Sequence, residues 1–278
     1  MARSDLSAER VEFLDDLACD VWGEFSGDTP TSVHSIASDL KLGPSYDDFG
    51  TDFDGILEHR SGQFHIYCNT GDNKYPIHPR VRFTLAHELG HYFIDEHRNA
   101  LRAGQPPKPS FPDRPGNDPV EHEANAFAAA LLMPRREFRE ALKSVPSGLK
   151  GILELGSTFG VSKQSAALRY ANASGRECAI VMFRNGSPPW WEISPLLERS
   201  GLNRINVQKD SIPSDSATGM ALKDSPSQVS EPHITNTLAS FWFGGVSCGS
   251  PRDVFLRESS VRLGLFGVLT LLEPITQR

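Results

Sequence analysis

The chain has 278 residues, of which 23% are charged, and its formal net charge is -7. This length allows about two domains and a sizeable hydrophobic core. The acidic balance argues against strong non-specific binding to nucleic acid, and no apolar run approaches the roughly 18–20 residues of a membrane-spanning helix.

Two helices are predicted at the start, over residues 5–25, which are amphipathic, and residues 33–40. Residues 43–55 are rich in Gly, Asp and aromatic residues and are predicted to form a loop. Two short strands follow with Gly62 at their turn, and Phe64–Asn69 is the better strand of the pair.

An HExxH sequence stands in the next predicted helix, residues 80–96, which Pro79 precedes. His87 and His91 are four residues apart, so they share one helical face and lie about 6 Å apart along the axis. They can therefore present two imidazoles to one metal ion. Glu88 is one step round the helix and can face a metal-bound water without being a ligand. This division of roles is typical of zinc hydrolases.

A connection rich in Pro, residues 98–117, is predicted to be irregular and to form either a rim of the site or a plain surface loop. The helix beyond it begins well, with Asp118 as a capping residue and Pro119 at the first position. This helix is very rich in Ala up to Met133, and small residues allow another helix to approach closely.

A catalytic zinc usually takes three protein ligands and keeps a fourth position for water. The candidates for the third ligand are Glu121, His122, Glu123, His97 and His78. Glu121 has the best spacing within its helix, although it can also act as a capping-box carboxylate. Asn125 lies four residues on, on the same face, where its oxygen can accept the N–H of a ligand imidazole.

Residues 151–174 are predicted to form two short helices joined at Gly160, and the pair resembles a helix-turn-helix. Lys163, Gln164 and Arg169 offer little for reading bases, so a packing or partner-docking role is favoured over DNA binding.

The composition changes after Cys178. A hairpin is predicted from Ala179–Phe183 and Trp190–Ile193. Residues 209–230 are predicted to be loop, and the apolar runs at residues 238–244 and 263–272 are predicted to be strands. A separate C-terminal domain is therefore expected.

Two stretches, Arg82 to His91 and Glu121 to Pro134, together resemble the ImmA/IrrE family of metallopeptidases. The resemblance carries over His87, His91 and Glu121 as metal ligands and Glu88 as catalytic base, with Zn²⁺ or Mn²⁺ as the metal. It implies an α+β fold with three parts. These are a zincin-like domain with a small antiparallel sheet (residues 1–145), the helix-turn-helix-like segment (146–175) and a GAF-like α/β domain (176–278).

The function implied by this resemblance is that of an intracellular endopeptidase of narrow specificity. Its substrate would be a helix-turn-helix transcriptional repressor, and cleavage would induce a stress or mobile-element response. The alternative is a DNA-binding or ligand-sensing regulator with a non-catalytic zinc site, against which the intact Glu88 argues. The C-terminal domain is also a candidate for a small-molecule ligand, which its sequence does not identify.

Further roles follow from the proposed reaction. A donor should stabilise the oxyanion, and Tyr92, His97 and His233 are candidates among which the sequence does not choose. The strand with Phe64, Ile66 and Cys68 is predicted to pair with an extended substrate by strand addition. Four isolated cysteines and a start without an apolar signal region lead us to expect a cytoplasmic protein with no membrane contact.

Overall fold

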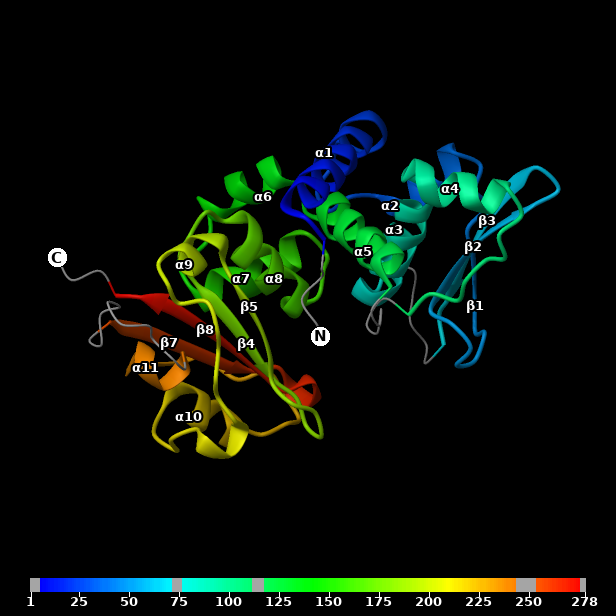
Figure 1. The fold of residues 1–278 in the computed structure, drawn as a ribbon. Helices are drawn as coiled ribbons and strands as arrows, with labels where there is room; N and C mark the ends of the chain where they lie inside the picture. Colours follow the sequence, from blue (N-terminus) through cyan, green and yellow to red (C-terminus); the bar gives the residue numbers. More distant parts are fainter. Residues whose placement is uncertain (1–5, 72–76, 112–117, 244–253, 276–278) are drawn as a thin grey trace. The chain divides into compact units, whose positions relative to one another are not determined.

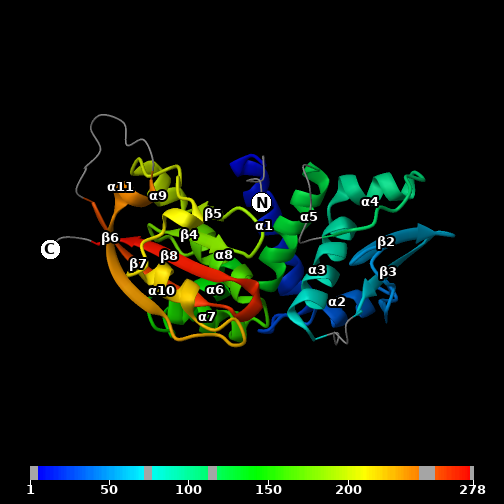
Figure 2. The ribbon, with the colours of Figure 1, turned by 90° about the horizontal axis from the view of Figure 1, so that it is seen from below.

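The computed structural model describes residues 6–71, 77–111, 118–243 and 254–275. The chain divides into two compact units, Ala2–Glu140 with Gly156–Ser165, and Ala141–Leu155 with Ala166–Arg278. Figures 1 and 2 show the elements of each unit in two views. The predicted division at residues 145 and 175 stays a prediction. No helix in the described part of the chain is long and apolar enough to cross a membrane.

The first unit contains helices whose starts follow from local sequence. They are α1 (Ala8–Phe25), α2 (Val33–Asp39), α3 (Pro79–Phe93), α4 (Asp95–Arg102), α5 (Pro119–Leu132) and most of α6 (Arg135–Leu142). The helix predicted over residues 80–96 ends at Phe93, because Ile94 takes an extended backbone conformation. α4 then occupies part of the connection predicted to be irregular.

A small sheet lies on one side of α3, and α5 lies on the other side (Figures 1 and 2). Its strand order is β1 (Ser45–Asp47), β3 (Gln63–Asn69), β2 (Gly55–Arg60). Ser61 and Gly62 join β2 to β3, and both take positive φ, 53° and 79°, as a two-residue hairpin turn requires.

Two predictions about this sheet are wrong. The sheet is mixed rather than antiparallel, because β1, inside the predicted loop, pairs in parallel with β3. The substrate-pairing edge was predicted at Phe64, Ile66 and Cys68, but their strand β3 is central and is paired on both sides. Ile66 and Cys68 are fully buried.

The predicted pair of short helices is present as α7 (Leu149–Thr158) and α8 (Lys163–Ala173). Gly160 has a φ of 61° at their junction. Arg82 of α3 holds this turn, since its Nε donates to the Gly160 carbonyl at 3.0 Å and its Nη2 to the Phe159 carbonyl at 3.3 Å. The turn is thereby fixed to the helix that carries the HExxH sequence.

The second unit contains an antiparallel sheet of order β5-β4-β8-β7-β6. Its strands are β4 (Ala179–Phe183), β5 (Trp190–Ile193), β6 (His233–Leu238), β7 (Phe255–Arg262) and β8 (Val268–Pro274). Short helical segments accompany the sheet: α9 (Pro195–Arg199), η1 (Lys209–Ser211), α10 (Ala217–Lys223), α11 (Ala239–Trp242) and η2 (Gly264–Phe266). Val181, Phe183, Trp242 and Leu272 belong to its buried core.

The hairpin of β4 and β5 was predicted correctly. The other C-terminal boundaries were not. The predicted loop at 209–230 contains α10, residues 239–242 are helical, and η2 precedes β8 within the run 263–272. Apolar runs alone do not distinguish a buried strand from a buried helical turn. Residue 244 and Cys248 lie outside the described residues. The GAF-like description stays a prediction.

Candidate active site

Two helices carry the predicted ligands, and local sequence fixes where each begins. The Nδ1 of His78 accepts the Arg80 N–H at 3.2 Å at the start of α3. The Oδ1 of Asp118 accepts the Val120 N–H at 3.0 Å at the start of α5. Each helix has Pro at its first position, where no N–H is needed.

Gly90 allows these two helices to approach closely. A Cβ atom at Gly90 would lie only 3.2 Å from the Cα and carbonyl oxygen of Ala124 on α5. The small residue within the HExxH sequence therefore faces a small residue within the Ala-rich helix. This contact brings the first turn of α5 against the face of α3 that carries the histidines.

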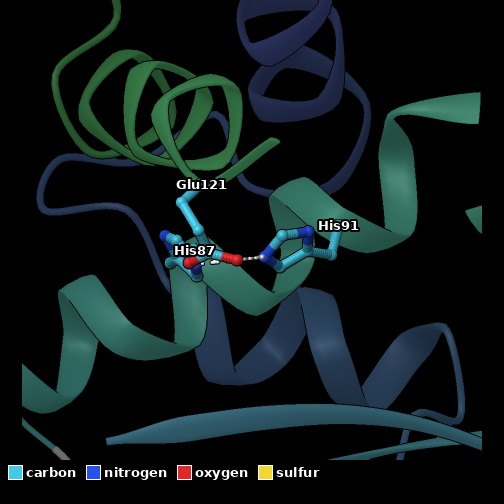
Figure 3. A group of neighbouring side chains, drawn as sticks. All are labelled: His87, His91 and Glu121. Carbon is cyan, nitrogen blue, oxygen red and sulfur yellow. Dashed lines mark hydrogen bonds and ion pairs between the residues drawn. The ribbon is translucent and has the colours of Figure 1, made fainter. Parts of the chain in front are cut away.

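Three side chains converge where the helices meet (Figure 3). The Nε2 atoms of His87 and His91 are 3.1 Å apart. The carboxylate of Glu121 places one oxygen 3.2 Å from the Nε2 of His87 and the other 3.5 Å from the Nε2 of His91. All three residues are buried, with His87 fully so.

This spacing suits a first-row metal ion. Tetrahedral bonds of about 2.0–2.1 Å place neighbouring ligand atoms about 3.3 Å apart. The two Nε2 atoms are 3.1 Å apart, and each lies 3.2 or 3.5 Å from one of the two Glu121 oxygens, which is close to that value. Two imidazoles and one carboxylate are also a ligand set that such metals accept. The residues present therefore fit one divalent transition metal, and the geometry does not distinguish zinc from manganese.

Each histidine has a second contact through Nδ1. The Nδ1 of His87 lies 2.9 Å from the Oδ1 of Asn125, and such a contact with a ligand imidazole was predicted from the position of Asn125 four residues after Glu121. The Nδ1 of His91 lies 3.1 Å from the Nδ1 of His97 on α4. Both Nε2 atoms are thereby left to face Glu121.

His97 is in turn held by Glu123, whose Oε2 is 3.1 Å from its Nε2. Arg10 of α1 donates to both oxygens of Glu123, at 2.9 and 2.7 Å. Sequence reasoning missed this arrangement, because it treated His97 and Glu123 as alternative ligands and gave Arg10 no role. The only local signal was that Glu123 points about 200° round the helix from Glu121.

Glu88 is buried next to the predicted ligands and contacts few polar groups. It is 1% exposed, and neither carboxylate oxygen accepts a hydrogen bond of normal geometry. Burial raises its pKa to about 7, while the charge of His87, the Ser110 hydroxyl and the Leu57 amide partly oppose that rise. A Cβ at Gly55 of β2 would lie 2.4 Å from the Oε1 of Glu88, so only glycine leaves room for this carboxylate.

The two ligand histidines differ in their proton affinity. Burial lowers the pKa of both, but Glu121 and the charge of Glu88 raise that of His87 above its usual value. The pKa of His91 falls well below the usual value because of its burial and the nearby His87 and His97.

Tyr92 and His97, the candidate oxyanion donors of the first unit, make other contacts. Tyr92 stacks edge-on against Phe64, with ring centroids 5.3 Å apart. His97 is engaged through both ring nitrogens, so it does not face outward as an oxyanion donor. His233 belongs to the second unit, where it pairs with Asp224 at 2.9 Å. The oxyanion donor therefore stays unassigned.

Two other residues that were candidates for the third ligand make different contacts. His78 caps α3 and Glu123 pairs with Arg10.

The second unit has an open hollow of about 490 Å³. Arg176, Glu177, Arg257 and Glu273 contribute charged side chains to its lining. No further observation identifies a ligand there, so the predicted small molecule stays a prediction.

Known proteins resemble different parts of the chain. Residues 73–170 match the model of the IrrE N-terminal-like domain, Peptidase_M78. Metallopeptidase ImmA of Bacillus subtilis (strain 168) is 27% identical over 111 residues, which are 40% of this chain and 59% of that protein. A solved Mycobacterium tuberculosis transcriptional regulator has a similar fold, with a TM-score of 0.59 and 16% identity over 96% of this chain and 90% of that one.

Proposed function

We propose that this protein is a metal-dependent endopeptidase, because residues 73–170 match the model of the IrrE N-terminal-like domain and metallopeptidase ImmA is similar over 111 residues. His87, His91 and Glu121 are the proposed ligands, Glu88 is the proposed general base, and zinc is the proposed metal. The observation that carries this proposal is the cluster of three side chains whose ligand atoms lie within 4.8 Å of one another, beside a buried carboxylate whose oxygens accept no hydrogen bond of normal geometry.

A metal ion held by these ligands would polarise the scissile carbonyl and acidify a water molecule. Glu88 takes the proton of that water and delivers it to the leaving amine. Its raised pKa, about 7, suits a group that must both accept and release a proton near neutral pH. Gly55 leaves the space that the carboxylate needs, and Asn125 orients His87 through its Nδ1–H.

The outer edge of β2 is the proposed substrate-binding edge, in place of β3. The backbone N–H of Asn69 donates to the Asp54 carbonyl. Backbone groups alternate in direction along an antiparallel strand, so those of Gly55, Leu57 and His59 point away from β3. Ser110 already pairs with Gly55 on this side, its N–H donating to the Gly55 carbonyl at 2.9 Å. An extended substrate adds to the same edge by antiparallel pairing at Leu57 and His59, beside Glu88.

The proposed substrate is a transcriptional repressor of the helix-turn-helix class. The support is the family match alone, and nothing at the site selects a sequence. The test is to incubate the purified protein, loaded with zinc or manganese, with the repressor-like proteins of its own host and to look for cleavage. One defined cut in one of them is the expected result.

The decisive variant is Glu88→Gln, which keeps the size of the side chain but removes the base. It should retain about one metal ion per chain and lose roughly 10²–10⁴-fold in cleavage rate. Glu9→Gln, at an exposed position of α1, is the matched control and should cleave normally. Cleavage by Glu88→Gln at the wild-type rate would refute the mechanism. Retention on specific DNA at physiological salt, without proteolysis, would favour the alternative of a non-catalytic regulator.

A further inference from the structure

We infer that His97, Glu123 and Arg10 form a polarised hydrogen-bond chain that fixes the tautomer of His91, so that its Nε2 lone pair faces the metal position. The chain joins four helices of the first unit, from Arg10 on α1 through Glu123 on α5 and His97 on α4 to His91 on α3. This inference rests on the metal site proposed above and adds a positioning role for three residues outside the ligand set.

The direction of the chain follows from its outer end. A guanidinium can only donate hydrogen bonds, and Arg10 donates to both oxygens of Glu123, so this carboxylate is ionised and can only accept. The Nε2 of His97, 3.1 Å from Glu123, must then carry the hydrogen. A neutral imidazole has one N–H, which leaves a lone pair on the Nδ1 of His97.

The same reasoning passes from His97 to His91. Their Nδ1 atoms are 3.1 Å apart, and two lone pairs at that distance would repel each other. Because the Nδ1 of His97 accepts, the Nδ1 of His91 must donate, and the Nε2 of His91 is then free of hydrogen. That nitrogen is the one that lies 3.5 Å from Glu121.

Burial makes this arrangement specific. His97 is 8% exposed, and the side chain of Glu123 is 16% exposed, so water competes little for either contact. Burial lowers the pKa of His97, although the contact with Glu123 raises it. The Nδ1 of His87 has an acceptor of its own, since it lies 2.9 Å from the Oδ1 of Asn125.

The variants that test this hydrogen-bond chain differ in whether they provide an acceptor for the Nδ1–H of His91. His97→Leu removes the acceptor and should weaken metal binding about 10–100-fold. His97→Gln supplies an amide oxygen for His91 and an amide N–H for Glu123, so it should restore much of that loss. His34→Leu replaces an exposed histidine that contacts Tyr46, and it should bind metal like the wild type. Metal affinity is measured by competition with a chromogenic chelator, using zinc alone.

The tautomer itself is measured without metal. Long-range ¹H–¹⁵N spectra of the metal-free protein, labelled at histidine, distinguish Nδ1–H from Nε2–H rings. His91 should be mainly the Nδ1–H form in the wild type and should lose that preference in His97→Leu. Circular dichroism and thermal unfolding show whether each variant is folded.

Two results would overturn the inference. One is a wild-type His91 that is mainly the Nε2–H form, and the other is a folded His97→Leu variant that binds zinc as tightly as the wild type. Failure of the proposed function has a different signature, since the protein would then bind no metal or cleave nothing while the tautomer of His91 still followed His97.

Discussion

Replacing Gly55 by Ala adds one methyl group where β2 passes Glu88, the proposed general base. That methyl carbon would lie 2.4 Å from the Oε1 of Glu88 and 2.6 Å from the Cγ2 of Thr84. Ordinary contacts begin at about 3.4 Å, so the carboxylate would have to move by about 1 Å. No atom of the proposed ligands His87, His91 and Glu121 is among the three nearest to that methyl carbon.

We expect this single added methyl group to lower the cleavage rate strongly. A displacement of about 1 Å in a reacting group can cost roughly 10²-fold in rate. Overpacking a well-filled site also costs about 1–3 kcal/mol in the free energy of unfolding. Adding Thr84→Ser removes the second clash, so the double variant should regain part of the stability and none of the activity.

The assay combines metal content, cleavage rate and denaturant unfolding on the same preparations. Gly23→Ala is the control, because a Cβ at Gly23 meets nothing within 4 Å. We expect Gly55→Ala to keep about one metal ion, to cleave about 100-fold more slowly and to be modestly destabilised. A Gly55→Ala protein with full activity, or one that loses its metal together with its activity, would refute the reasoning.

Three other predictions concern the ligands and their support. Gly90→Val should separate α3 from α5, weaken metal binding and lower the free energy of unfolding by about 1–3 kcal/mol. Adding Ala124→Gly should recover part of the metal binding and part of the stability. A double variant that recovers neither would argue against the contact between Gly90 and Ala124. Asn125→Leu should weaken metal binding about 10–100-fold, with the exposed Asn172→Leu unchanged as control. Removal of metal with a chelator should lower the free energy of unfolding by about 2.7 kcal/mol relative to metal at 100 times its dissociation constant, and an unchanged melting temperature would contradict binding to the folded state.

The local parts of the site could be predicted from the sequence. His87 and His91 share a face because helix geometry places residues four apart together, whatever surrounds them. The starts of α3 and α5 follow from Pro79 and Asp118 for the same reason, since a cap depends on neighbours in the chain. These are short-range effects, and they were enough to indicate a resemblance to a metallopeptidase family before any contact between elements was known.

The tertiary structure decided everything that depends on which elements meet. Five residues were candidates for the third ligand, and only the crossing of α3 and α5 at Gly90 brings Glu121 to the histidines. The composition of residues 43–55 is typical of a loop and gave no sign of β1, whose partner residues in β3 are 22 positions away. The edge strand was therefore predicted to be β3 instead of β2. The chain from Arg10 to His91 joins residues up to 113 positions apart, and no local pattern encodes such a distance. Sequence spacing thus specified two proposed ligands and a proposed base, and packing specified which residues complete the cluster and orient them.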